Sequence, residues 1–215
     1  MVIMKLYFSN SGKIAIASTA FTLLLLIMCI IHTHEITYIF YVWNLFLAFV
    51  PLAISNTLRK QSGFTFRSVI YLLIWLLFFP NASYLITDLF HFTEREGCPK
   101  WYDLILVSSA LWNGLLIAIL SLLQVEEFLM KVFSYKKVQV FLLFFISLAG
   151  FGVYLGRFQR FNSWDVVSNP QRLTLYIINS LLHPYQNLTA WLFTLIFSLL
   201  FGIIFFTIKS MTLNF

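Results

Sequence analysis

Charge is scarce in this chain. Only 10% of its 215 residues are charged, whereas 60% are hydrophobic, and the mean hydropathy is +0.88. A water-soluble domain of this size needs more charge to cover its surface. The apolar residues also form runs of about 20, the length at which a helix crosses the hydrocarbon core of a bilayer. The shortage of charge therefore excludes an ordinary soluble domain and predicts an integral membrane protein.

Other absences narrow the possible functions. The chain has no Walker loop, Rossmann glycines, HExxH or GxSxG motif. Its two cysteines, Cys29 and Cys98, have neither metal-ligand nor redox spacing. The sequence thus indicates no metal, leaves any cofactor unknown, and neither establishes nor excludes an enzyme. We attribute the net charge of +6 to membrane orientation, not to nucleic acid.

The apolar runs predict an all-α fold. They lie near residues 14–31, 36–55, 68–86, 102–124, 138–156 and 188–208. They do not alternate apolar and polar residues as strands of a transmembrane barrel would. We expect a bundle of about six transmembrane helices that forms one membrane-embedded domain over residues 1–215, with short interfacial helices on the outer face. One such interfacial helix is predicted over residues 171–182, after Asn169 and Pro170.

Basic residues predict the orientation. With the N-terminus in the cytoplasm, nine lysines and arginines flank the spans inside and five outside. Cytoplasmic loops collect Lys and Arg. We therefore expect a multi-pass protein of the bacterial plasma membrane with both termini in the cytoplasm, and basic residues that anchor the inner face. The first apolar run is read as a retained helix and not a cleaved signal peptide.

Two spans carry unusual residues. Pro80 interrupts the third apolar run, and proline removes a helix hydrogen bond, so we expect a bend there, with residues 84–92 along the outer interface. The fifth run contains Gly152 and Gly156, a small-xxx-small pattern that lets another helix approach closely. A packing role is the favoured interpretation of these glycines.

A first candidate site follows Pro80. Asn81 is a candidate for substrate binding, and Asp88 and His91 are three residues apart, which puts them on one helical face. An aspartate beside a histidine can raise the basicity of the imidazole, so the two are candidate catalytic residues, as a general base or as metal ligands. The alternative is a polar edge at the membrane interface with a local hydrogen bond.

A second candidate site ends the fifth span. Arg157 and Arg160 form a basic pair on the predicted outer side, where the positive-inside rule does not explain them. Guanidinium groups suit bidentate contacts with phosphate or carboxylate. The candidate substrate-binding residues in this segment are Tyr154, Arg157, Arg160, Asn162 and Asp165. The alternatives are snorkelling to lipid headgroups and structural pairing with an aspartate.

Other polar residues have simpler explanations. Asp103 begins the fourth span, where the helix dipole favours an acid. Asn44 and Asn113 lie inside spans, where we expect hydrogen bonds between helices. His32 and His34 lie in a short outer turn, and exposure of this turn to solvent accounts for both histidines.

The motifs around these sites carry a resemblance. The segments Phe79-Pro80-Asn81-Ala82-Ser83-Tyr84 with Thr87-Asp88-Leu89-Phe90-His91, and Tyr154-Leu155-Gly156-Arg157 through Trp164-Asp165, resemble the bacterial integral-membrane family DUF1361, a domain of unknown function. The similarity extends from about the second span to the sixth. Ser83 stands where the family pattern leads us to expect proline. The resemblance implies a multi-span membrane protein and no particular activity.

The leading hypothesis is therefore a site for an anionic, phosphate-bearing lipid or lipid-linked substrate on the outer face. Its expected partners are membrane lipids and not nucleic acid, and the oligomeric state stays open. One alternative is a small transporter with a broken third helix. Another is a non-catalytic partner subunit or receptor that packs through its glycine-rich fifth span.

Overall fold

The structure is a computed structural model that describes residues 2–36, 38–91 and 99–213. Its elements are α1 (Val2–Thr33), α2 (Phe40–Arg59), α3 (Phe66–Tyr84), the 3-10 helix η1 (Leu85–His91), α4 (Lys100–Met130), α5 (Tyr135–Phe158), α6 (Asp165–Ser168), α7 (Pro170–Leu182) and α8 (Leu188–Leu213). Six helices in this described part are long and apolar enough to cross a membrane. The predicted all-α bundle of about six spans is confirmed.

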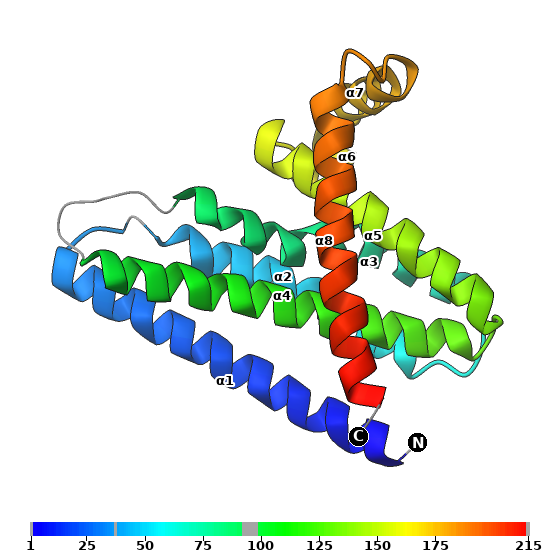
Figure 1. Cartoon of the computed structure of the whole chain (residues 1–215), viewed down its shortest axis with the longest axis horizontal. Coiled ribbons are helices and arrows are strands. Elements are labelled where there is room, and N and C mark those ends of the chain that lie inside the picture. The colour runs from blue at the N-terminus through cyan, green and yellow to red at the C-terminus, as the bar shows by residue number, and fades with distance from the viewer. Residues whose placement is uncertain (1, 37, 92–98, 214–215) are drawn as a thin grey trace.

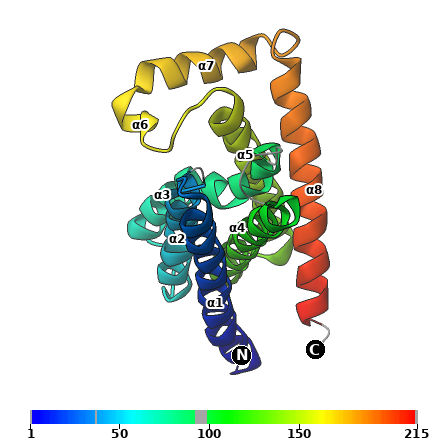
Figure 2. The same cartoon turned by 90° about the vertical axis from the view of Figure 1, so that its left-hand side faces the viewer.

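Helix α4 is the centre of the bundle. It contacts α1, α2, α3, η1 and α5, and more than half of its most apolar stretch is buried. Figure 1 shows α1, α2 and α4 running side by side, with α8 crossing them steeply and α5 beside it. In Figure 2, α7 lies across one end of the molecule and joins α6 to α8. We call this end the α7 end, and the opposite end, where Lys209 lies, the Lys209 end.

Polar side chains join the helices inside the bundle. Asn113 of α4 donates to the Thr22 hydroxyl of α1 at 2.7 Å and to the Ser18 carbonyl at 3.2 Å. On another face, the Trp75 indole of α3 donates to Ser121 of α4 at 2.7 Å. Such bonds orient helices in lipid, where unpaired polar groups are costly. The expected interhelical role of Asn113 is confirmed.

After Pro80 the chain packs inward against α4. The α-helix continues through Pro80 to Tyr84 and then tightens into η1. Leu85 and Asp88 are buried whereas Leu89 is exposed, so one face of η1 packs into the bundle. The reason is Gly114 of α4: a Cβ atom there would lie 2.5 Å from Leu85 Cβ. A glycine without this atom lets η1 turn inward against α4.

The glycines of α5 are packing positions, as predicted. A Cβ atom at Gly152 would lie 2.5 Å from Pro80 Cγ, and one at Gly156 would lie 3.3 Å from the Tyr84 ring. Both glycines thus bring α5 against the proline turn of α3. The close approach places the end of α5 next to η1, which positions the candidate site.

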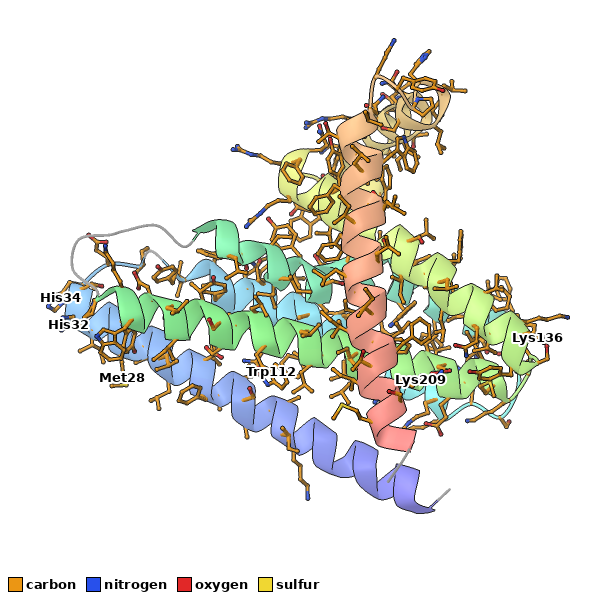
Figure 3. The ribbon with its side chains drawn as sticks, viewed as in Figure 1. Met28, His32, His34, Trp112, Lys136 and Lys209 are labelled. Atoms are coloured by element: carbon orange, nitrogen blue, oxygen red, sulfur yellow. The ribbon has the colours of Figure 1, made fainter. Side chains whose placement is uncertain are left out.

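The Lys209 end is more than basic anchoring. The ammonium of Lys209 on α8 donates to Glu126 of α4, and Gln139 of α5 donates to the same carboxylate oxygen at 3.1 Å. The aromatic rings of Tyr135 and Phe206 each lie 5.7 Å from the Lys209 nitrogen. Figure 3 shows Lys209 and Lys136 toward this end, with His32 and His34 far from them. The sequence-based expectation that these basic residues only anchor is therefore wrong for Lys209.

Candidate functional site

A cavity of about 340 Å³ lies at the α7 end, between α2, α3, η1, α5 and the segment that follows α5. Its polar lining comes from Asn44, Asn81, Tyr84, Asp88, Asn162 and Ser163. Its aromatic lining comes from Phe40, Trp43 and Phe161. Ligand sites in proteins combine apolar walls with a few polar groups in this way. We call this feature the α7-end cavity.

Asp88 is the acidic group of the cavity. Its side chain is only 1% exposed because η1 packs inward against α4. The Arg157 Nη1 atom lies 3.4 Å from Asp88 Oδ1, which makes an ion pair. Asn44 of α2 lies beside the same carboxylate. Within the described residues, however, neither carboxylate oxygen has a donor at hydrogen-bonding geometry. A buried acceptor in this state is suited to receive a donor from a ligand or from water.

Arg157 lies behind Asp88 and does not itself line the cavity. Its guanidinium donates to the Tyr84 hydroxyl at 3.1 Å and to the Thr87 carbonyl, and it sits 5.1 Å from the centre of the Tyr84 ring. The last turn of α5, just after Gly156, carries it there. These contacts tie α5 to η1, and they orient Arg157 toward protein groups instead of toward open space.

Asn81 and Ser163 close one wall of the cavity. The Asn81 amide donates to the Ser163 hydroxyl at 2.8 Å and to the Phe78 carbonyl at 3.0 Å. Ser163 in turn donates to the Leu77 carbonyl at 3.0 Å. Pro80 has no backbone N–H to donate in this turn of α3. The Ser163 hydroxyl, from the segment that follows α5, supplies a donor to the neighbouring Leu77 carbonyl. The wall thus has its hydrogen-bond donors already engaged.

Asp165 has a structural position outside the cavity lining. Its carboxylate accepts from the backbone N–H of Asn162 at 2.7 Å, from the Ser168 hydroxyl at 2.9 Å and from the Asn169 amide at 3.2 Å. The Asn162 N–H, followed by the Asn169 amide, lowers the pKa of Asp165 below its ordinary 3.8. The charged form therefore holds the chain between α5 and α7.

Tyr154 and Arg160 also lie apart from the cavity lining. The Tyr154 ring stacks on Phe158, and its hydroxyl lies 3.5 Å from that of Tyr176 on α7. Burial, followed by this contact, raises the pKa of Tyr176 to about 12. Arg160 is exposed, with a left-handed backbone at φ 57° where the chain leaves α5.

The structure therefore brings together only part of the predicted site. Asn81, Asp88 and Asn162 line the cavity, and Arg157 supports it from behind. The basic pair of Arg157 and Arg160 is divided: Arg157 faces Asp88, whereas Arg160 has a left-handed backbone and is exposed. His91 ends η1, but its side chain lies outside the described residues, as does Cys98.

Sequence reasoning missed several lining residues. Trp43 and Asn44 come from the start of α2, and Tyr84 and Ser163 complete the wall. The one available signal was Asn44, a polar residue inside an apolar span. Instead of only joining helices, Asn44 lies next to Asp88 and faces the cavity.

The six apolar helices and their shared packing define a multi-pass α-helical membrane protein. Comparison with known families identifies it further. The chain belongs to the family described as protein of unknown function DUF1361, whose model matches residues 43–205, from α2 to α8. This agrees with the resemblance in the sequence motifs. No curated protein and no solved structure matches the chain.

Proposed function

We propose that the α7-end cavity holds the headgroup of an anionic, phosphate-bearing lipid or lipid-linked substrate. The observation that carries this proposal is a cavity of about 340 Å³ in a membrane protein, with polar and aromatic lining and a buried ion pair at its wall. Acyl chains would stay among the apolar helix faces while the headgroup enters the cavity. A site of this kind fits an amphiphile better than a free solute.

The charges around the cavity suggest where a phosphate would sit. Asp88 already balances Arg157, so this pair offers little net charge. Two exposed arginines lie closer to the rim: Arg160 directly precedes Phe161, and the Arg172 guanidinium lies 4.9 Å from the centre of the Phe161 ring. We assign the phosphate to these two, with Asn81 and Asn162 contacting the headgroup. Arg157 then acts as a positioning residue for Asp88.

The same cavity supports two kinds of activity. Asp88 could accept a proton from a bound hydroxyl as a general base. His91 follows three residues later, at the end of η1. The transporter alternative is favoured by η1, since irregular backbone inside a membrane protein occurs where it lines a cavity. Uptake of substrate into vesicles would favour the transporter over an enzyme.

Bound lipid tests the proposal directly. The protein is purified in a mild detergent, and its retained lipids are measured by mass spectrometry. The double variant Arg160→Gln/Arg172→Gln should retain much less anionic lipid, because both rim charges are lost. Arg67→Gln, at the opposite end of α3, is the matched control and should retain the normal amount. Equal anionic lipid in the double variant and the control would overturn the proposal.

The orientation is part of the proposal. With both termini in the cytoplasm, the α7 end faces outward in the plasma membrane, as the nine-to-five bias of basic residues favours. An impermeant thiol reagent applied to intact cells should then label Cys98, whereas Cys29, which is buried, should stay unlabelled. Labelling of Cys98 only after the cells are opened would reverse the orientation.

A further inference from the structure

One wall of the α7-end cavity, formed by Asn81, Asp88 and Ser163, presents acceptors. Both oxygens of the Asp88 carboxylate are buried, and although Arg157 and Asn44 lie beside them, no described residue makes a well-formed hydrogen bond to either oxygen. Asn81 uses its amide N–H groups on Ser163 and Phe78, which leaves its carbonyl oxygen as an acceptor. Ser163 gives its own proton to Leu77. A ligand that complements this wall must therefore bring donors of its own.

The ion pair decides which donors suit the wall. Arg157 already supplies one positive charge to Asp88. A ligand ammonium in contact with Asp88 would put two cations beside one buried anion, and an uncompensated buried charge is costly. A hydroxyl group donates a hydrogen bond without adding charge. Hydroxyl donors are therefore favoured over ammonium donors.

The remaining walls fit the same chemistry. Asn44 and Asn162 carry amides, which both donate and accept, as hydroxyl groups do. Trp43 and Phe161 contribute aromatic rings to the same cavity, and the C–H groups of a polyol can pack against these rings. The cavity thus combines acceptors, amides and flat apolar surface.

We propose that the headgroup in this cavity carries hydroxyl groups beyond its phosphate, as a glycerol or glycosyl headgroup does, and that one of them donates to Asp88. This inference rests on the proposed headgroup site and names its ligand class. Asn162 contacts a second hydroxyl at the mouth of the cavity. Headgroups that end in a bare alkyl group or an ammonium are bound less well.

The test uses lipids that differ only in the headgroup. The full-length protein is delipidated in detergent and titrated with phosphatidylglycerol, phosphatidylethanol and phosphatidylethanolamine that share the same acyl chains. Phosphatidylethanol has the charge of phosphatidylglycerol but no headgroup hydroxyl. Binding is measured by native mass spectrometry, with thermal stability as a second readout. We expect phosphatidylglycerol to bind about fivefold more tightly than phosphatidylethanol, the effect of one hydrogen bond.

Two variants locate the preference. Asp88→Asn keeps the shape of the side chain but turns one acceptor into a donor, and it should abolish the preference. Asn162→Ala, at an exposed cavity residue whose side chain can be removed without disturbing the core, should reduce it. Asn162→Ala also keeps the test valid if Asp88→Asn fails to fold. A preference that survives undiminished in the folded variants would overturn the inference.

The lipid series separates the two proposals. Equal binding of phosphatidylglycerol and phosphatidylethanol by the natural protein would refute the hydroxyl requirement and leave the anionic headgroup site standing. Tightest binding of phosphatidylethanolamine would also refute it, in favour of an ammonium donor. Binding of none of the three lipids would overturn both proposals.

Discussion

Each end of the bundle contains a buried ion pair, but the two pairs have different surroundings. At the Lys209 end, Glu126 accepts from both Lys209 and Gln139, and aromatic rings cover the ammonium. At the α7 end, Asp88 faces Arg157 but borders a cavity, and its oxygens lack a donor in the described part of the chain. An ion pair thus closes one end of the bundle, whereas the ion pair at the other end borders a cavity.

The largest expected effect is at the Lys209 end. Glu126→Leu removes the carboxylate that balances Lys209 and should lower the free energy of unfolding by about 3 kcal/mol, because a buried charge is left uncompensated. Asp88→Asn should cost less, since Arg157 keeps its contacts with the Tyr84 hydroxyl and the Thr87 carbonyl. Unfolding in a mixed-detergent titration measures both. An Asp88→Asn loss as large as that of Glu126→Leu would contradict the contrast between a closed and an open pair.

A second effect concerns the cavity wall. Gly152→Leu should lower the free energy of unfolding by about 2 kcal/mol, because its Cβ atom alone would meet Pro80 at 2.5 Å. Gly202→Leu is the matched control: nothing lies within 4 Å of a Cβ atom at Gly202 on α8. Thermal melting in detergent compares the two. Equal melting temperatures would show that α5 does not pack tightly on α3.

A smaller effect is expected at Arg160, where stability depends on the backbone conformation and lipid binding on the side-chain charge. Arg160 has φ 57°, a conformation that glycine adopts without steric cost, so Arg160→Gly should stabilise the fold by about 1 kcal/mol. His34, at φ 55°, provides the control. Both glycine variants should melt higher, but only Arg160→Gly should retain less anionic lipid. Normal lipid in a stabilised Arg160→Gly would remove Arg160 from the proposed site.

The smallest effect depends on pH. The pKa of Asp165 is lowered below 3.8 in the folded state, so its stabilisation is complete above the unfolded value and is lost as pH falls through the folded value. The melting temperature should thus decrease as the pH is lowered below about 4, and the decrease should be smaller in Asp165→Asn. An identical pH profile in the variant would show that other carboxylates cause the acid loss.

The spans and the glycine packing could be predicted from the sequence, whereas the position of η1 and the grouping of the cavity residues could not. The spans followed from hydropathy alone, and the packing of Gly152 and Gly156 followed from their spacing, because both depend on local patterns. The position of η1 did not, because it depends on Gly114, about 30 residues away in the chain and on another helix. The grouping of Asp88 with Asn44 and Asn162 is likewise long-range, and the left-handed turn at Arg160 left no recognised signal.

By itself, the sequence determined a six-helix membrane protein of the DUF1361 family and the segments that carry its polar residues. Apolar length and short motifs are sufficient for this, since lipid requires every span to satisfy its own backbone. Only the tertiary structure decided which polar residues meet. It paired Arg157 with Asp88, turned Arg160 outward, and tied Asp165 to its own loop. Those outcomes depend on how closely α3, α4 and α5 approach, which glycines on different helices set together.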